Sequence, residues 1–301
     1  MKDVSLIATL PDLDNENAVV EVFKNPHISE ARYNVGAISH MGVMQTLEFL
    51  KNLSNKYGKK IWIDIKGRQT RVAKWNGIKP KYGFIELNHC LKVSYPAVIC
   101  LRGDKCYRII DIEDNKVFVD TNKMLIVGEG QSVNILADDV NIEGYLTDAD
   151  IQYLQACEKL GMNDIMASFV ESFNDFSEIL RYLPKANVVA KIESPKGVNF
   201  ISEYEAPISL MAARDDLYIE TRRDYKTMYE SLQKIIIRDP NAILASRIFT
   251  SLKDNEIPEW SDYADLALMY QMGYRHFMLD DNVCNFRFRQ AIAAWEVFLN
   301  A

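Results

Sequence analysis

Eight short apolar segments alternate with amphipathic segments along this chain. Each apolar segment has a β-branched or aliphatic centre and no internal proline, as buried parallel strands require. The expected strands are residues 4–10, 31–38, 60–65, 164–170, 188–193, 208–214, 242–247 and 276–280. Helical spacing of apolar residues predicts helices at residues 15–24, 41–57, 148–160, 175–183, 197–205, 224–237, 259–272 and 288–299. Eight strands, each followed by a helix, predict an α/β fold with a closed (β/α)8 TIM barrel. An open doubly wound sheet is disfavoured because the first strand–helix turn lacks the dinucleotide-binding glycine fingerprint.

The alternation breaks once, between residues 71 and 143. Short strand-like segments with tight turns lie there, at residues 84–87, 91–101, 106–112, 117–120 and 124–127. This pattern predicts a small antiparallel β domain inserted after the third barrel strand. We therefore expect a barrel of residues 1–70 and 144–301 and a β-rich lid of residues 71–143. A passive surface elaboration is the other interpretation of such an insert.

The composition suits one barrel with a small insert and restricts the partners. The chain has 301 residues, 48% of them hydrophobic, so it can bury a sizeable core. A net charge of −7, from 35 basic and 42 acidic residues, argues against nucleic acid or an anionic membrane as the main partner. The N-terminal apolar stretch is too short for a signal peptide, and no run approaches the ~20 apolar residues that span a bilayer.

The cysteines point to a reducing compartment. They are odd in number and lack paired metal-ligand spacing, so we expect reduced thiols in a cytoplasmic protein. The five are Cys90, Cys100, Cys106, Cys157 and Cys284.

Two neighbouring predicted strands end in charged residues. Lys191 and Glu193 close the strand at residues 188–193, and Arg214, Asp215 and Asp216 follow the next one. The C-terminal ends of barrel strands meet at the mouth where barrel enzymes build their sites. A Glu and an Asp there can hold a hard divalent cation, with a lysine beside them to meet negative charge on a substrate. The alternative is a salt bridge between neighbouring strands.

Several motifs, in order along the chain, resemble the pyruvate kinase family over nearly the whole sequence. Asp64-Ile-Lys-Gly-Arg-Gln-Thr-Arg71 resembles that family's Asp-Thr-Lys-Gly-Pro-Glu-Ile-Arg, and Val133-Asn-Ile-Leu-Ala-Asp-Asp-Val-Asn-Ile142 resembles the exit of its lid domain. The later matches lie at the expected strand ends: Ala167-Ser-Phe-Val170, Ala190-Lys-Ile-Glu193, Ala213-Arg-Asp-Asp-Leu217, Ile243-Leu-Ala-Ser-Arg247 and Met278-Leu279.

The resemblance implies catalytic and metal-binding roles for five side chains. Glu193 and Asp216 are similar to the family's ligands of Mg²⁺, for which Mn²⁺ can substitute. Lys191 resembles the lysine that stabilises the transferring phosphoryl group or the enolate. Arg71 resembles the phosphate-contacting arginine, and Ser246 stands in place of a threonine near the substrate. A lysine and a metal ion facing a developing anion suit phosphoryl transfer or enolate chemistry on physical grounds too.

The resemblance also implies how the substrate is held. The backbone amides of Arg214, Asp215 and Asp216 are expected to receive the substrate carboxylate at a helix start, although Asp215 replaces a family glycine. Arg68 and Arg247 are our candidates for recognition of an anion other than ADP, because arginine binds phosphates and carboxylates bidentately.

The second expected strand departs from the family pattern. If Ser39-His40 is kept in register, the catalytic arginine falls at Val35 and the asparagine of the monovalent-cation site at Ala37. The segment Ala31-Arg-Tyr-Asn34 matches literally but lies three residues too far from Ser39. The sequence leaves both registers open. Ser39 and Asp64 stay as weak ligands for a monovalent cation, and a K⁺ requirement stays undecided.

The nucleotide side of the expected site is eroded. A lysine of the family appears as Asn285, the basic residues before the lid's exit strand are replaced around Gly130-Gln131, and Asp280-Asp281 replaces a Ser-Gly pair. Two carboxylates there would repel a polyphosphate. The chain also stops after the eighth helix, so the family's C-terminal regulatory domain is expected to be absent.

Three functions follow from this asymmetry. The first is a Mg²⁺-dependent, pyruvate kinase-like phosphotransferase acting on phosphoenolpyruvate, pyruvate or a related phosphorylated acid, with an altered nucleotide side. The second is a metal-dependent lyase, aldolase or decarboxylase of a 2-oxo acid that works through a pyruvate enolate. The third is a catalytically degenerate binding or regulatory protein. The expected partner is a small molecule; nucleotide binding and the oligomeric state stay open.

Overall fold

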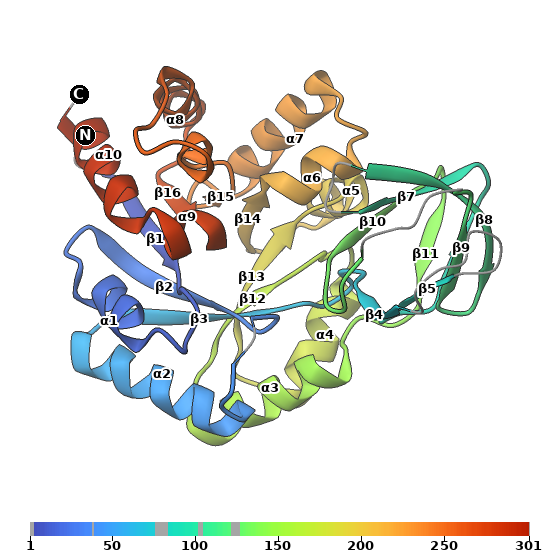
Figure 1. The fold of residues 1–301 in the computed structure, drawn as a ribbon, viewed down its shortest axis with the longest axis horizontal. Helices are drawn as coiled ribbons and strands as arrows, with labels where there is room; N and C mark the ends of the chain where they lie inside the picture. The colour runs from blue at the N-terminus through green and yellow to red at the C-terminus, as the bar shows by residue number, and fades with distance from the viewer. Residues whose placement is uncertain (1–2, 38, 76–83, 102–104, 122–126, 301) are drawn as a thin grey trace.

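Eight parallel strands close into a barrel (Figure 1) in the computed structural model, which describes residues 3–37, 39–75, 84–101, 105–121 and 127–300. Their order around the barrel is β1-β16-β15-β14-β13-β12-β3-β2. The strands are β1 (Ser5–Thr9), β2 (Ile28–Asn34), β3 (Lys60–Ile65), β12 (Asp164–Ala167), β13 (Asn187–Ile192), β14 (Ser209–Ala213), β15 (Ile243–Ala245) and β16 (His276–Leu279). The predicted (β/α)8 barrel is confirmed, since every adjacent pair of strands is parallel.

Eight longer helices surround the barrel (Figure 1). They are α1 (Glu16–Lys24), α2 (Val43–Tyr57), α3 (Asp148–Leu160), α4 (Phe173–Tyr182), α5 (Pro195–Glu203), α7 (Tyr225–Arg238), α8 (Trp260–Met272) and α10 (Phe288–Asn300). Their apolar faces pack on the strands in one large core, while a second cluster that includes Trp62, Met166 and Met211 fills the barrel interior. None of the helices in the described ranges is long and apolar enough to cross a membrane.

The insert forms antiparallel sheets with a core of its own. Six strands follow the order β10-β7-β8-β9-β5-β4, and β6 pairs with β11. Their bounds are β4 (Val72–Trp75), β5 (Phe84–Leu87), β6 (Leu91–Val93), β7 (Ala97–Leu101), β8 (Lys105–Glu113), β9 (Lys116–Val119), β10 (Val133–Leu136) and β11 (Val140–Ile142). A separate apolar cluster that includes Ile85, Ile99 and Val117 holds them together. Figure 1 shows the insert projecting from one side of the barrel.

The structure corrects two of the expected strands. The second barrel strand is Ile28–Asn34 and not residues 31–38, of which residue 38 lies outside the described ranges. The expected strand at residues 91–101 is two strands, β6 and β7, separated by a turn that contains Pro96, whose nitrogen cannot donate to a sheet. The strand expected at residues 124–127 lies outside the described residues except for Val127, which is not in a strand.

Short helical segments at the strand ends escaped the sequence pattern. They are α6 (Arg214–Glu220), α9 (Asp281–Phe286) and the 3₁₀ turn η1 (Thr250–Lys253). Segments of four to seven residues are too short to show a full apolar stripe. For the segment after β14 the family resemblance implied a helix start at Arg214, Asp215 and Asp216, and the structure has these residues in the first turn of α6.

The structure also corrects the expectation that all cysteines are reduced. Cys100 and Cys106 form a disulfide. They stand directly opposite each other where β7 pairs with β8, which brings the two sulfur atoms together. Cys90, Cys157 and Cys284 are free thiols.

Candidate functional site

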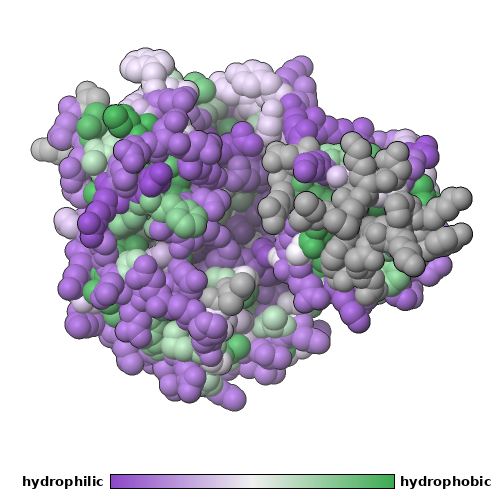
Figure 2. Space-filling view, in the orientation of Figure 1, coloured by the Kyte–Doolittle hydropathy of each residue, from purple (hydrophilic) through white to green (hydrophobic). Residues whose placement is uncertain are grey.

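A cavity of about 630 Å³ lies at the C-terminal mouth of the barrel, between the barrel strands and the insert. Figure 2 shows a hollow with hydrophilic residues around it at the centre of this face. The lining comes from β2, β13, β15 and β16, from α6 and α9, and from β10 of the insert. Barrel enzymes place their reacting groups at this end of the strands.

Lys191 points into the cavity from β13. Its buried Nζ atom donates to Ser168 Oγ at 2.8 Å and to Asp64 Oδ1 at 3.3 Å, and it lies 3.2 Å from Glu193 Oε1. Burial opposes the charge, but the carboxylates of Asp64 and Glu193 outweigh it and raise the pKa of the lysine. The ammonium therefore stays charged at neutral pH.

Glu193 directly follows β13 and is buried. Its Oε2 atom accepts the backbone N–H of Phe169 at 2.7 Å. Burial, with a smaller contribution from the carboxylates of Asp216 and Asp64, raises the pKa of Glu193 to about 7. Together they outweigh the ion pair with Lys191. A cation beside this carboxyl group would therefore favour its ionised form.

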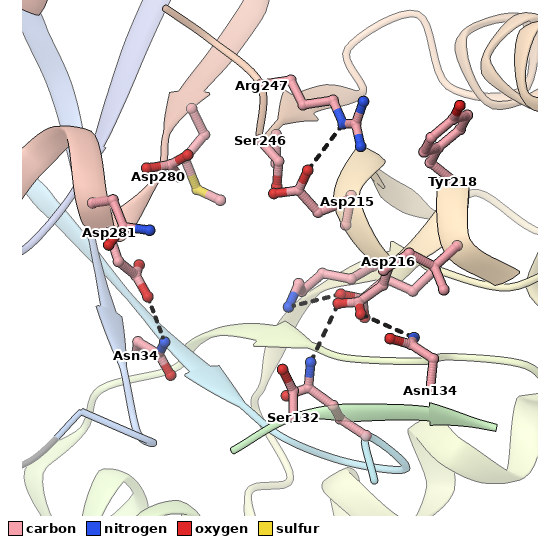
Figure 3. Close-up of a pocket in the computed structure, with 18 of the residues that line it drawn as sticks. Asn34, Ser132, Asn134, Asp215, Asp216, Tyr218, Ser246, Arg247, Asp280 and Asp281 are labelled. Carbon is pink, nitrogen blue, oxygen red and sulfur yellow. Dashed lines mark hydrogen bonds and ion pairs between the residues drawn. The ribbon is translucent and has the colours of Figure 1, made fainter. Parts of the chain in front are cut away.

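Asp216 lies in the first turn of α6 and is held by the insert (Figure 3). Its Oδ1 atom accepts from Asn134 Nδ2 at 3.1 Å and its Oδ2 atom from Gln69 Nε2 at 3.3 Å. Asn134, on β10, also donates to Glu220 Oε1 at 3.0 Å. Burial raises the pKa of Asp216, and it raises that of Glu220 to about 8. One amide group thus joins the insert to two carboxyl groups of α6.

Arg71 lines the cavity where the chain enters the insert. Its Nε and Nη2 atoms donate to Gln69 Oε1 at 3.0 and 2.8 Å, and its Nη1 atom donates to the Gly130 carbonyl at 2.5 Å. None of these partners is charged. The guanidinium therefore brings a positive charge to this edge of the cavity, where the carboxylate of Asp216 attracts it electrostatically.

Ser246 and Arg247 follow β15 and line the cavity. Their φ angles, 65° and 59°, lie in the left-handed region that residues other than glycine rarely adopt. Arg247 Nε donates to Asp215 Oδ1 at 2.9 Å, and its guanidinium stacks 4.6 Å from the centre of the Tyr218 ring (Figure 3). Asp215, which replaces a family glycine, therefore fixes the arginine that was expected to bind an anion.

The side chains of Arg214 and Arg68 do not line the cavity. Arg214 donates from Nε and Nη2 to the Ser246 carbonyl and from Nη1 to Asp265 at 2.7 Å. Arg68 forms two hydrogen bonds, of 3.0 and 2.6 Å, to Asp175, the buried carboxylate in the capping box of α4. Arg68 instead lines a second cavity of about 620 Å³ between the insert and the starts of α4 and α5, and its expected role in anion recognition stays a prediction. The backbone of Arg214 still opens α6, whose N-cap, Ala213, gives no side-chain hydrogen bond.

The structure decides the register of the second strand in favour of Arg32. Both Arg32 and Asn34 line the cavity, and Val35 and Ala37 do not. Arg32 lies 2.6 Å (Nε) and 2.5 Å (Nη2) from Asp64 Oδ2. Its Nη1 atom donates to Asp281 Oδ1 at 2.7 Å. The literal match at residues 31–34 was the correct signal, and the register of residue 39 was misleading.

Lys66 is a cavity residue that the sequence reasoning quoted within a motif but did not single out. It is buried, and its Nζ atom donates to Asn34 Oδ1. Burial and, to a smaller extent, the charge of Arg71 together lower the pKa of Lys66 to about 7. A lysine directly after a barrel strand was the available signal.

The expected monovalent-cation ligands are not brought together around the cavity. Ser39 does not line it, and its Oγ atom accepts the Met41 N–H at 3.1 Å. Asp64 is fully buried. Burial alone would raise its pKa, but Arg32 and Lys191 outweigh burial and lower it. Its carboxylate therefore already has two cationic partners.

The two aspartates on the eroded side have cationic partners as well. Asp280 caps α9 by accepting the Val283 N–H at 2.9 Å, and Lys253 Nζ lies 2.7 Å from its Oδ2 atom. Asp281 pairs with Arg32 and accepts from Asn34 Nδ2 at 3.0 Å (Figure 3). Their repulsion of a phosphate is thus weaker than two free carboxylates would give.

The donor set suits a divalent cation bound jointly with a ligand. No group of three or more His, Cys, Asp and Glu side chains within the described ranges is placed to hold a metal alone. Glu193 and Asp216 face one cavity, and burial raises the pKa of both. Mg²⁺ in proteins commonly uses one or two carboxylates and completes its shell with water and substrate oxygens. These two residues fit that pattern.

Comparisons with known proteins agree with this geometry. The family model described as pyruvate kinase, barrel domain, matches residues 97–284. The chain is 23% identical to a pyruvate kinase of Lactobacillus delbrueckii subsp. bulgaricus, over 89% of this chain and 51% of that protein. It is 21% identical to a pyruvate kinase of Borreliella burgdorferi, over 88% of this chain and 61% of that protein. The chain thus spans about half to three fifths of the length of these curated relatives. Because the family model covers more than half of the sequence, the chain belongs to the pyruvate kinase family.

Proposed function

We propose that the cavity is the active site of a Mg²⁺-dependent, pyruvate kinase-like phosphotransferase. Its substrate would be phosphoenolpyruvate, pyruvate or a related phosphorylated acid. The observation that carries the proposal is the meeting of Lys191, Glu193 and Asp216 around one cavity at the mouth of a closed barrel. An ammonium and two carboxyl groups at strand ends, two of them in ion-pair contact, suit a substrate that carries both a metal ion and negative charge.

The chain's own groups would divide the work as follows. Glu193 and Asp216 would hold the metal ion, which when bound supplies charge neutralisation and orients the substrate oxygens. As the phosphoryl group passes to an acceptor oxygen, the bond between phosphorus and the enol oxygen would break, and the Lys191 ammonium would stabilise the negative charge that develops on the enol oxygen. Arg71 would contact the phosphoryl group, which is supported by its place in the cavity lining and by its hydrogen bonds to neutral partners.

The acceptor side would differ from that of an ADP-dependent enzyme. Arg247 is fixed by Asp215, and Lys253 is paired with Asp280, so two cations on this side are already engaged. A polyphosphate would have to compete with these carboxylates. This supports an altered nucleotide side. We also propose a cytoplasmic location, which the three free cysteines support and the Cys100–Cys106 disulfide opposes.

The test combines ligand binding with turnover. Oxalate, which mimics the pyruvate enolate, should bind in calorimetric titration only when Mg²⁺ or Mn²⁺ is present. Lys191→Met should retain oxalate binding and lose turnover by about 10²-fold or more, the scale of a lost anion-stabilising donor. Lys185→Met, the same change at an exposed lysine, is the control. Unchanged turnover in Lys191→Met, or oxalate binding that does not require Mg²⁺ or Mn²⁺, would refute the proposal.

One observation favours a second candidate, a metal-dependent lyase. Arg247 and Lys253, on the side where a phosphoryl acceptor would bind, are already paired with carboxylates. Lys191, on the other side, could stabilise an enolate in a reaction that has no phosphoryl acceptor. Incubation with oxaloacetate and Mg²⁺ but no nucleotide separates the two candidates. Pyruvate release that Lys191→Met abolishes would favour the lyase. The main argument for a degenerate binding or regulatory protein was the absence of the family's arginine from the second strand. Arg32 lies in the cavity, so that argument no longer holds.

A further inference from the structure

The disulfide of the insert lies in one row with Asn134. Cys100 on β7 stands directly opposite Asn134 on β10 and also directly opposite Cys106 on β8. Directly opposed residues of antiparallel strands point to the same face of the sheet. The neighbouring pair of Ile99 and Ile135 belongs to the core of the insert, on the other face. The disulfide and the Asn134 amide therefore share the face that lies outside that core.

This face of the insert lies against α6. Asn134 donates to the carboxyl groups of Asp216 and Glu220, and β10 is the insert strand beside α6 in Figure 1. Cys106 lines a cavity of about 440 Å³ between the insert and the C-terminal end of α6. The lining on the barrel side is Ile219, Arg222 and Arg223. A group attached to Cys106 would enter this cavity and press on the contact that Asn134 makes with α6.

The two sulfur atoms differ in access. Cys100 is fully buried, whereas Cys106 is exposed. In thiol–disulfide exchange a thiolate attacks one sulfur and displaces the other as a thiolate. An incoming thiolate would therefore bond to Cys106 Sγ and release Cys100, whose thiolate takes a proton from water. A second molecule of thiol would remove the adduct as a small disulfide and leave both cysteines reduced.

The charges beside Cys106 favour an anionic thiol. Among the described residues, the cavity lining holds two arginines, Arg222 and Arg223, and one acid, Asp138, which is paired with Arg222. The lining thus carries one more positive than negative charge, which attracts an anionic group and stabilises an attacking thiolate. Its volume lies in the range of small-molecule sites.

We propose that the Cys100–Cys106 disulfide is an exchange site for small anionic thiols, which attach at Cys106 and loosen the hold of the insert on α6. The attachment rests only on the disulfide and its surroundings. The weaker ligand binding that follows rests on the proposed function, because Asn134 holds the Asp216 carboxyl group that we assign to the metal.

The first experiment follows exchange with reduced glutathione, an anionic tripeptide thiol. Protein purified without reductant is incubated with it, and the reaction is stopped with acid. Free thiols are then blocked with N-ethylmaleimide in denaturant, and peptides are analysed by mass spectrometry. We expect glutathione on Cys106 and the blocking group on Cys100. Two free thiols in the purified protein, an adduct at Cys100, or a disulfide that resists glutathione would overturn the inference.

A comparison of two thiols tests the charge preference. After correction for the thiolate fraction, anionic 2-mercaptoethanesulfonate should react about threefold or more faster than cationic cysteamine at low ionic strength. Arg222→Gln should reduce this preference. Arg181→Gln, the same change at an exposed arginine of α4, should leave it intact. Equal rates for the two thiols in the wild type would overturn the assignment of an anionic thiol.

The effect on the site is measured on the purified glutathione adduct. Amide hydrogen exchange of β10 should be faster in the adduct than in the disulfide form, without any ligand. Its Mg²⁺-dependent oxalate affinity should be about threefold or more weaker. Cys106→Ser, which removes the attacked sulfur, should not respond to glutathione. Cys90→Ser, at a free thiol, should respond as wild type.

The outcomes separate this inference from the proposed function. Unchanged hydrogen exchange of β10 in the adduct would overturn the loosening. Equal oxalate affinities of the adduct and the disulfide form would overturn its effect on the site. Absence of oxalate binding in both forms would instead refute the proposed function, and hydrogen exchange would still decide the loosening.

Discussion

The two walls of the cavity carry similar residues in opposite electrostatic states. On the wall built by β13 and α6, burial raises the pKa of the carboxyl groups of Glu193 and Asp216. On the wall built by β2, β3 and α9, cationic partners outweigh burial and lower the pKa of Asp64 and Asp281. Arg32 bridges those two acids.

The difference between the two walls is whether the buried carboxyl groups already have enough positive charge beside them. Acids that remain under-compensated after folding gain most from a cation that arrives with a ligand. Acids that already hold an arginine gain little and contribute to the folded state through that pair. We therefore propose that metal and substrate bind at the wall built by β13 and α6, which we call the metal wall. The wall built by β2, β3 and α9, which we call the support wall, already has cationic partners for its acids.

The largest expected effect tests the support wall. Arg32→Ala leaves the fully buried Asp64 without its closest cation, so the free energy of unfolding should fall by about 3–5 kcal/mol. Urea unfolding monitored by circular dichroism measures it. Arg289→Ala, which removes an exposed arginine paired with Glu21, should change little. Equal losses in the two variants would show that the support wall is not a stabilising network.

A pH experiment sharpens the contrast on the metal wall. Burial raises the pKa of Glu193 to about 7 from an ordinary 4.5, so the folded protein keeps a proton that the unfolded chain releases between those values. Metal-free protein should therefore lose stability as pH rises from about 4.5 to 7, by an amount of the order of 3 kcal/mol. Glu193→Gln should remove this component, and Mg²⁺ should reduce it.

Unfolding in EDTA at pH 5 and pH 7.5 measures the effect as a difference between variant and wild type. Glu203→Gln, the same change at an exposed glutamate, is the control. A stability difference between wild type and Glu193→Gln that does not vary with pH would contradict the assignment of this carboxyl as under-compensated.

The smallest expected effect concerns the insert. Asn134→Ala removes the hydrogen bonds that lower the pKa of Asp216 and Glu220, so both acids should become harder to ionise. We expect Mg²⁺-dependent oxalate affinity to fall by about five- to tenfold, near 1 kcal/mol. Asn141→Ala, at an exposed asparagine on β11, is the control. Equal affinities in the two variants would disconnect the insert from the site.

The barrel and the charged ends of β13 and β14 could be predicted from the sequence because they depend on local patterns. β13 and β14 are apolar runs that end in charges, and the structure places them within one residue of the expected bounds. A buried parallel strand needs continuous apolar residues, and its C-terminal end needs no distant information to reach the mouth.

The ion pairs of the support wall could not be predicted from the sequence because the paired residues are far apart in the chain. β2 contains a buried arginine and a half-exposed Glu30, so its apolar signal is weaker than that of the residues after it. Arg32 can be buried only because Asp64 and Asp281 are opposite it, and they lie 32 and 249 residues away. Likewise, the disulfide of the insert depends on a hairpin register that spacing alone does not determine.

The hydrogen bonds of Asn134 link two events that might otherwise be independent. If the insert moved away from α6, the partly buried carboxyl groups of Asp216 and Glu220 would both lose the hydrogen bond from Asn134. Any ligand that favours ionised Asp216 strengthens its bond to the amide and thereby holds the insert down. Thermodynamic linkage is reciprocal, so a closed insert must favour that ligand by the same free energy.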